Sequence, residues 1–412
     1  MQTEYFQLQN GMWIISHHDP TSPLIHISMD IKVGASVDSI PGIAHVCEHL
    51  LFTGTQNFPD YDQVLLEHGA TNNAWTAYDN SNFHCTAPPE SLPKLLEVEA
   101  DRLANVSEYL NETVFQTEKS VVFNEMNESF HDDPYHPLML EEYASLFGPN
   151  HPYGHPIIGL HDDLEKIELE TVRAFLKEWY QPANATLLIA GGFDRQILSD
   201  ALDTHMKPLV GHESIEQPQP FPPQRPFSTH TQMYVQASYG YVGLDWILPP
   251  ISSSILIAAN ILCDILSAAQ YGLLYRDIEL DLRWASEVET DLYAMKIASV
   301  FSISAVVHEE LHREKVKNRI LYHLDRIANG LLDPLLLKKS KKKFKLYWLL
   351  QHEDIEERVE RYQEWLRFHA NLSGLKAYTE SFQQVTMSEL QGLARHLLST
   401  PYLTLDGFPK QS

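Results

Sequence analysis

The chain has 412 residues, of which 44% are hydrophobic and 21% charged, and its formal net charge is -25 at pH 7. This length suggests two or three domains, and the absence of any run of about 20 apolar residues argues against a membrane span. The excess of acidic groups repels nucleic acid and favours neutral or cationic ligands.

The first half of the chain predicts a mixture of strands and helices. Alternating apolar residues predict strands, whereas apolar residues three and four positions apart predict helices. In chain order these are strands at 12–17 and 25–33, helices at 43–52 and 61–68, strands at 72–76 and 82–86, helices at 92–103, 112–130 and 164–179, and a strand at 185–190.

A proline-rich stretch divides the chain at residues 211–227, which can form neither a helix nor a central strand. Beyond it the pattern repeats, with a strand at 232–242, helices at 253–267 and 272–278, strands at 284–293 and 297–307, and mostly helix at 312–398. We therefore predict an α+β protein of two homologous domains, each a mixed or antiparallel sheet covered by helices. The predicted domains are residues 1–210 and 228–412, joined by the linker 211–227.

The cysteines and the N-terminus favour a reducing compartment. Cys47, Cys85 and Cys263 are too few and too scattered for a disulfide framework or a paired thiolate zinc site. Residues 1–10 lack the basic start and the apolar block of a secretory signal. We therefore expect a cytoplasmic protein.

The segment His45-Val46-Cys47-Glu48-His49 carries the clearest chemical signal. Histidines four apart lie one turn above each other on a helix, so both imidazoles can bind one zinc ion. Glu48 lies on the same side and can reach a water beside that ion without being a ligand. A chance pair of histidines is the alternative, but His-x-x-Glu-His is a known inverted zinc motif.

A catalytic zinc normally has three protein ligands, so a third residue is needed. The acidic helical stretch at 118–128 offers Glu118, Glu125 and Glu128. Glu118 and Glu125 are seven residues apart and share one helix face, so one of them can bind the metal while the other orients a histidine. The residues alone do not distinguish these three candidates from one another, or from an exposed acidic helix.

The first half resembles the pitrilysin family of inverted-zinc metallopeptidases. The resemblance covers the stretches 42–55, 73–76, 121–126, 151–159 and 184–186. It implies zinc-dependent hydrolysis of peptides, with one Zn²⁺ per chain and a two-domain, half-clamshell fold. It also implies that His45, His49 and Glu125 bind the metal, because the family's third ligand follows the second histidine after about 75 residues, here residues 50–124.

The same resemblance assigns roles to two further acidic residues and to one cysteine. Glu48 is the expected general base, and Glu118 matches an acidic residue that supports the family's site without binding metal. Cys47 occupies a variable position and is expected to pack in the core.

A short stretch, residues 73–76, resembles the edge strand that binds the extended substrate in this family. It comprises Asn73, Ala74, Trp75 and Thr76. Trp75 serves equally well as a core aromatic, and the sequence leaves both roles open.

The second half departs from the family where an arginine and a tyrosine, seven residues apart, are expected to hold the substrate. Glu279 and Ser286 occupy those positions, and neither can supply the missing donors. Arg276 or Arg283 could replace the arginine and Tyr293 the tyrosine from neighbouring places.

The family builds its chamber from four such domains, whereas this chain has two. We therefore expect a homologous second subunit that supplies the Arg and Tyr, with short or unfolded peptides as substrates and no nucleic acid or membrane partner. The alternatives are a homodimeric peptidase that uses Arg276 or Arg283 from the other copy, and a non-catalytic scaffold or processing partner.

Overall fold

The computed structural model describes residues 2–211, 228–251, 254–351, 353–369 and 372–410. The expected linker therefore lies outside the described residues, apart from Gly211. The chain divides into two compact units: Met1–Asn127, Pro156–Gln219 and Leu350–Ser373 form the first, and Glu128–His155, Pro220–Leu349 and Gly374–Ser412 form the second. Each unit thus includes one segment from the other half of the chain, and the domain boundaries expected from the sequence remain a prediction.

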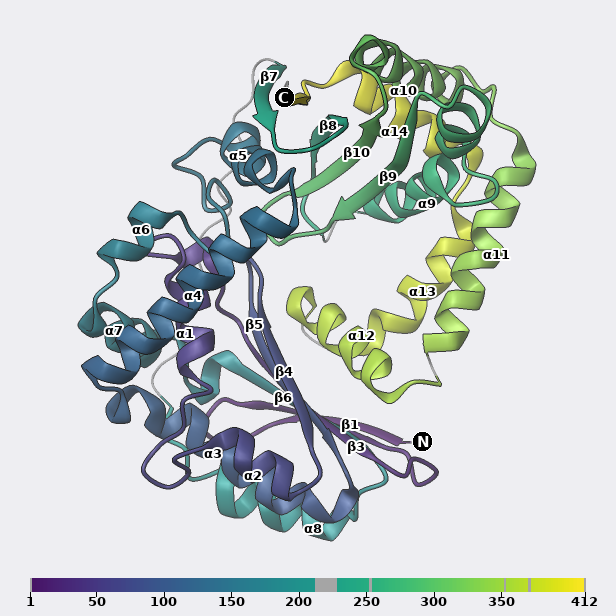
Figure 1. Cartoon of the computed structure of the whole chain (residues 1–412). Helices are drawn as coiled ribbons and strands as arrows, with labels where there is room; N and C mark the ends of the chain where they lie inside the picture. The colour runs from purple at the N-terminus through teal and green to yellow at the C-terminus, as the bar shows by residue number, and fades with distance from the viewer. Residues whose placement is uncertain (1, 212–227, 252–253, 352, 370–371, 411–412) are drawn as a thin grey trace. The chain divides into compact units, whose positions relative to one another are not determined.

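The first unit contains a six-stranded sheet in the order β1-β2-β6-β3-β5-β4 (Figure 1). The strands are β1 Gln2–Gln7, β2 Trp13–His18, β3 Ile25–Ile31, β4 Thr71–Thr76, β5 Ser81–Ala87 and β6 Ala185–Gly191. Strands β2 and β6 run parallel, and the other neighbours are antiparallel. Its helices are α1 Ile43–Leu50, α2 Tyr61–Glu67, α3 Leu92–Tyr109, α6 His161–Lys166, α7 Leu169–Trp179, α8 Arg195–Ala201 and α12 Ile355–Phe368, and α4 Glu112–Asp132 begins in this unit.

Both faces of the first sheet are covered, which explains why every residue of β3 is buried. On one face Ile27, Met29 and Leu187 join the large core beneath α1, α3 and α7. On the other face α12 packs against β3 and β6, with Val359 and Leu366 among the buried residues.

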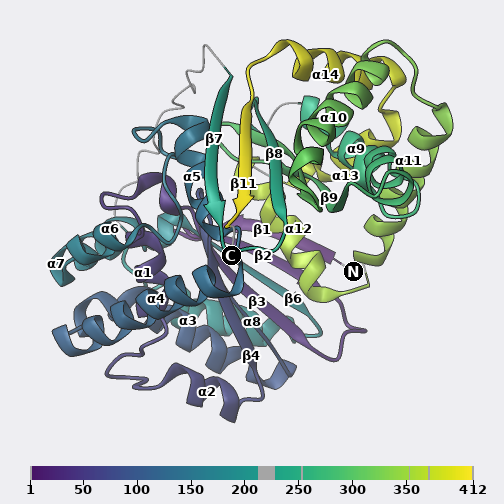
Figure 2. The same cartoon turned by 45° about the horizontal axis from the view of Figure 1, so that its top comes forward.

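The second unit contains a five-stranded sheet in the order β7-β11-β8-β10-β9 (Figure 2). The strands are β7 Thr229–Val235, β8 Gly240–Leu248, β9 Ala285–Tyr293, β10 Ser299–Val307 and β11 Leu403–Pro409. Its helices are α5 His136–Phe147, α9 Ile255–Ser267, α10 Arg313–Ala328, α11 Pro334–Gln351, α13 Leu375–Gln384 and α14 Met387–Ser399, and a π-helix, η5, spans Tyr275–Asp281. Strands β7 and β11 are parallel and the remaining pairs antiparallel. Two mixed sheets with helical layers confirm the predicted α+β class.

Several predicted elements were wrong in detail. The single strand expected at 232–242 is two strands, β7 and β8, separated by residues 236–239. The helix expected at 164–179 breaks into α6 and α7, and the Lys119 ammonium donates hydrogen bonds to the carbonyls of Glu165 and Ile167 at this break. Strand β1, helix α5 and strand β11 were not predicted.

No helix among the described residues is long and apolar enough to cross a lipid bilayer.

A buried ion pair attaches α12 to the first sheet and makes a prediction about stability. The guanidinium of Arg358 lies 2.8 Å from a carboxylate oxygen of Asp19, and both side chains are about 95% buried, with 6% and 5% exposed. Removing one partner of a buried pair costs about 3–5 kcal/mol because the other charge stays buried alone. We expect Arg358→Met to lower the free energy of unfolding by that amount in chemical denaturation, whereas Lys177→Met on the exposed face of α7 should change it little.

The same ion pair should depend on pH. The hydrogen bonds from Arg358 and Thr21 lower the pKa of Asp19 to about 2. Because this pKa is depressed in the folded state, the stabilisation is complete above the ordinary value of 3.8 and is lost as the pH falls towards 2. A pH-stability profile that is the same for wild type and Arg358→Met across this window would contradict the assignment.

Candidate metal centre

Helix α1 presents His45, Glu48 and His49, and its start is well defined. The carboxylate of Asp38 accepts hydrogen bonds from the backbone N–H groups of Gly42 (2.7 Å) and Ala44 (3.1 Å). Gly42 has a φ of 93°, and a β-carbon there would lie 2.6 Å from the carbonyl oxygen of Ile158, so only glycine fits.

The two faces of α1 differ in burial. Ile43, Ala44, Val46, Cys47 and Leu50 are fully buried in the core of the first unit. His45 and His49 lie on the other side, where their side chains are 12% and 20% exposed. The helix is therefore anchored by its apolar face and leaves both imidazoles accessible.

Helix α4 brings Glu125 to the two histidines. One carboxylate oxygen of Glu125 lies 3.1 Å from Nε2 of His49, and the other lies 3.7 Å from Nε2 of His45. Each of the three residues offers one ligand atom within 4.8 Å of the others, and this is the one such group in the described part of the chain. Glu118 lies next to it, with a carboxylate oxygen 4.0 Å from Nδ1 of His49, whereas Glu128 is not part of the group.

The electrostatics of this group follow from burial and from the paired charges. Burial lowers the pKa of His45 to about 4, so its imidazole is neutral near pH 7 and available as a ligand. Burial also lowers the pKa of His49, but the hydrogen bond to Glu125 and the nearby carboxylates outweigh it, and the net shift is upward. The hydrogen bond from His49 lowers the pKa of Glu125.

Glu48 contacts strand β4, a contact that the sequence did not indicate. The hydroxyl of Thr76, the last residue of β4, donates a hydrogen bond of 2.5 Å to the carboxylate of Glu48. Burial raises the pKa of Glu48, while this hydrogen bond opposes the rise. Thr76 is one of the residues expected to contact substrate, and its hydroxyl also contacts the Glu48 carboxylate.

Strand β4 lies at the edge of the first sheet and pairs with β5. Within the described ranges no strand pairs with its outer edge. Asn73 is exposed and its side-chain oxygen accepts a hydrogen bond from the Ala74 N–H, while Trp75 is only partly buried. The edge can therefore accept an added strand, and the role of Trp75 stays open.

The candidate residues of the second half lie in the second unit. Glu279 is engaged in a local contact, since its carboxylate accepts a 2.7 Å hydrogen bond from the Val288 N–H. Ser286 is partly buried in β9 opposite Val306, while Arg276, Arg283 and Tyr293 are exposed. The hydrogen bond of Glu279 therefore lies within the second unit.

The residues on α1 and α4 fit a zinc ion by their chemistry. Two imidazoles and one carboxylate from two helices match the donor set and the number of protein ligands of a catalytic zinc site. A neutral imidazole at His45 is the ligand form. An exposed acidic helix, the simpler alternative for α4, would not place Glu125 between two histidines.

Comparison with known proteins gives matches over most of the chain. Residues 13–158 match the family model "Insulinase (Peptidase family M16)", and residues 166–344 match "Peptidase M16 inactive domain". The zinc protease PqqE of Helicobacter pylori is 24% identical over 399 residues, which cover 95% of this chain and 89% of that protein. Human insulin-degrading enzyme is 26% identical over 232 residues, which cover 54% of this chain but only 22% of that enzyme.

Solved structures share the fold over nearly the whole chain. A protease from Helicobacter pylori has a TM-score of 0.92 at 23% identity and covers 99% of both chains. A peptidase M16 inactive domain from Pseudomonas fluorescens has a TM-score of 0.88 at 15% identity and covers 100% of this chain and 99% of that one. The periplasmic protease PqqL of Escherichia coli has a TM-score of 0.79 at 16% identity, and the match covers 98% of this chain but 47% of that one.

Proposed function

The chain belongs to the pitrilysin family, peptidase family M16, and on this premise we propose that it is a zinc-dependent endopeptidase subunit that hydrolyses short or unfolded peptides. The observation that carries the proposal is the convergence of His45, His49 and Glu125 within 4.8 Å, with Glu48 on the same helix. A scaffold has no need of a general base beside three metal ligands. The match to an inactive domain covers residues 166–344, which include none of these four residues.

In the proposed mechanism His45, His49 and Glu125 hold one zinc ion per chain. When bound there, the ion would supply Lewis-acid chemistry for a water and for the scissile carbonyl. Glu48 accepts the proton from the attacking water and delivers it to the leaving amine. Burial raises the pKa of Glu48, and the hydroxyl of Thr76 orients its carboxylate by a hydrogen bond.

Glu118 and strand β4 complete this half of the proposed site. Glu118 lies beside Nδ1 of His49, the ring nitrogen other than the one that faces Glu125, and is suited to orient that imidazole. The outer edge of β4, with Asn73, Ala74, Trp75 and Thr76, is suited to bind the extended backbone of a peptide by strand addition.

We propose that a homologous subunit supplies the substrate-holding Arg and Tyr. Glu279 and Ser286 stand where these residues are expected, and a carboxylate does not offer the N–H donors of an arginine; that of Glu279 accepts a hydrogen bond from the Val288 N–H. A homodimer that uses Arg276 or Arg283 in trans is the alternative, since both side chains are exposed. A cytoplasmic location remains a prediction, and the related PqqL is described as periplasmic.

Metal removal tests the proposal. A chelator should abolish peptide cleavage, and one equivalent of zinc per chain should restore it, as followed with a quenched fluorescent peptide and by elemental analysis. Glu118→Gln should weaken zinc binding about 10–100-fold, the usual effect of losing an outer partner of a metal ligand. Glu128→Gln removes the same charge from an exposed position of α4 and should leave zinc binding unchanged. Full peptidase activity in the metal-free chain would refute a zinc enzyme.

A further inference from the structure

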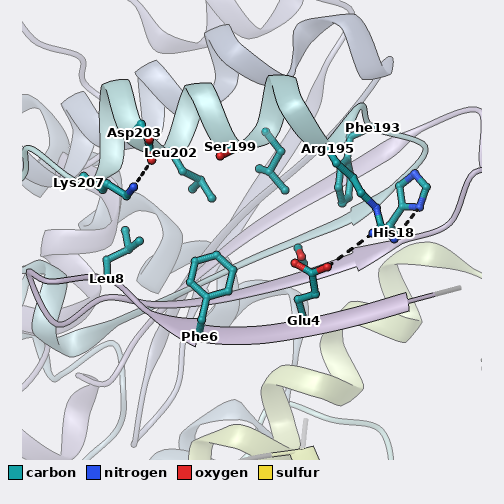
Figure 3. A pocket seen from close by; sticks show the side chains of 12 residues that line it. Glu4, Phe6, Leu8, His18, Phe193, Arg195, Ser199, Leu202, Asp203 and Lys207 are labelled. Carbon is teal, nitrogen blue, oxygen red and sulfur yellow. Dashed lines mark hydrogen bonds and ion pairs between the residues drawn. The ribbon is translucent and has the colours of Figure 1, made fainter.

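Two hollows in the described residues differ in how their charges are balanced. The first, of about 170 Å³, lies in the first unit between β1 and α8 (Figure 3). Its charged groups already form ion pairs, Arg195 with Glu4 at 3.6 Å and Lys207 with Asp203. It therefore offers little net charge to a ligand.

The second hollow, of about 210 Å³, lies in the second unit and is strongly acidic. Its lining contains five carboxylates and three tyrosines, and none of its lining residues is a lysine, arginine or histidine: the residues are Asp133, Tyr135, Met139, Glu142, Tyr241, Glu287, Glu289, Asp291, Tyr293, Ser302, Ser304 and Val306. We call this set the acidic pocket.

The strand register concentrates negative charge along one face of the sheet. Ser302 of β10 pairs with Asp245 of β8 on one side and with Asp291 of β9 on the other. Ser304 is the next residue of β10 on the same face of the sheet, and it pairs with Glu289. Asp245 is 1% exposed and accepts a 2.6 Å hydrogen bond from the Ser302 hydroxyl. Asp245 of β8 and Asp291 of β9 thus lie on either side of Ser302, and a bound cation would reduce the Coulomb repulsion between them.

Helix α5 adds a further carboxylate above this face. The helix packs against β7 and β11 of the same sheet, as Figure 2 shows for β7. Glu142 of α5 lines the pocket, is only 8% exposed, and makes no hydrogen bond or ion pair with any described residue. Burial and the charges of Asp245 and Asp291 raise the pKa of Glu142 well above its usual range. A buried carboxyl without a partner is expensive unless a ligand supplies one.

The size and the aromatic lining favour an organic cation over a metal ion. The pocket carboxylates do not form a group of three within 4.8 Å of one another, because the described residues contain one such group and it is the zinc candidate. The rings of Tyr135 and Tyr241 lie 5.3 Å apart, and Tyr293 lies on the same lining. Tyrosine faces attract cations, and a planar guanidinium can bind two carboxylates at once.

We infer that the acidic pocket binds the basic side chain of a peptide, arginine in particular, with the buried Glu142 at its floor and the exposed Glu289 and Asp291 at its rim. This inference rests on the proposed peptidase function for its substrate class. The pocket itself belongs to the second unit and does not require the metal centre in order to bind a cation.

The test measures binding separately from cleavage. The zinc-loaded full chain is titrated at low salt with N-acetyl-arginine amide and with N-acetyl-citrulline amide, which has nearly the same shape without the charge. Both probes are too short for an endopeptidase. We expect arginine to bind at least about tenfold more tightly than citrulline, as charge-assisted hydrogen bonds allow.

Single substitutions test whether arginine binds at the acidic pocket. Asp291→Asn and Glu289→Gln change exposed side chains of β9 and should preserve folding while weakening arginine binding about tenfold. Glu142→Gln tests the floor with a side chain of the same shape. Glu380→Gln, on α13 and outside the pocket lining, removes one negative charge from an exposed position and should have no effect.

The outcomes separate this inference from the proposed function. Equal binding of arginine and citrulline, or binding of divalent metal ions without a preference for arginine, would overturn the pocket assignment even if the chain cleaves peptides. Preferential arginine binding that is lost in the β9 variants supports the pocket, and it does so even if no peptide is cleaved, a result that would overturn only the peptidase proposal.

Discussion

Glu48→Gln should lower kcat for peptide cleavage about 10²–10⁴-fold, the usual contribution of a positioned general acid or base. Glutamine keeps the shape of the side chain and can still accept the hydrogen bond from Thr76, but it cannot take a proton from water. The substitution leaves His45, His49 and Glu125 in place, so zinc content should remain one per chain. Cleavage of a quenched fluorescent peptide and elemental analysis on the same sample measure both quantities.

A matched control tests whether the loss of any one glutamate charge from the first unit is enough to lower activity. Glu67→Gln changes an exposed glutamate of α2, in the same unit, and should leave kcat and zinc content at wild-type values. If Glu48→Gln retains full activity with zinc bound, Glu48 is not the proton carrier. If it loses zinc as well, the loss of activity says nothing about proton transfer, and the variant's KM and kcat must then be measured after reconstitution with excess zinc.

The second large effect concerns the partner subunit. Purified alone, the chain should cleave peptides about 10²–10³-fold more slowly than it does with a homologous partner, the range associated with loss of one donor to the developing oxyanion. The expectation follows from Glu279 and Ser286, which cannot supply that donor. The experiment isolates the chain from its source with whatever co-purifies, and then compares cleavage with and without that protein.

The homodimer alternative predicts a different result. It requires full activity from the purified chain, no change on adding the foreign partner, and a loss of activity in Arg276→Gln or Arg283→Gln. Mixing wild type with the Glu48→Gln chain then reports how many intact sites a dimer needs. A purified chain that is fully active while both arginine variants are unaffected would refute both forms of the partner hypothesis.

The fold class was readable from the sequence, but several elements were not. Strand β11 lies between β7 and β8, about 170 and 160 residues before it in the chain, and its pairing leaves no local signal. Strand β1 is an edge strand of largely polar residues, and such strands are weakly marked. Helix α5 has no distinctive sequence pattern, and only its packing against the second sheet shows that Glu142 is buried.

Only part of the candidate site could be predicted from the sequence, again because contacts between distant segments leave no local signal. The periodicity of one helix is enough to place His45, Glu48 and His49 together, because side chains three and four apart are local neighbours. The choice among Glu118, Glu125 and Glu128 required either the family resemblance or the tertiary structure. The hydrogen bond from Thr76 to Glu48 joins a helix to a strand and had no sequence signal.

By itself, then, the sequence predicted the helical metal motif and the α+β class, because each follows from patterns of residues close together in the chain, whereas the departure at Glu279 and Ser286 is implied only by the family resemblance. The tertiary structure decided which acid lies between the histidines, what orients Glu48 and where Glu142 is buried. These features depend on packing between segments 28 to 149 residues apart, such as Glu48 with Thr76, His49 with Glu125, and Glu142 with Asp291. Such contacts are set by the sum of many weak interactions across a core, which local patterns do not encode.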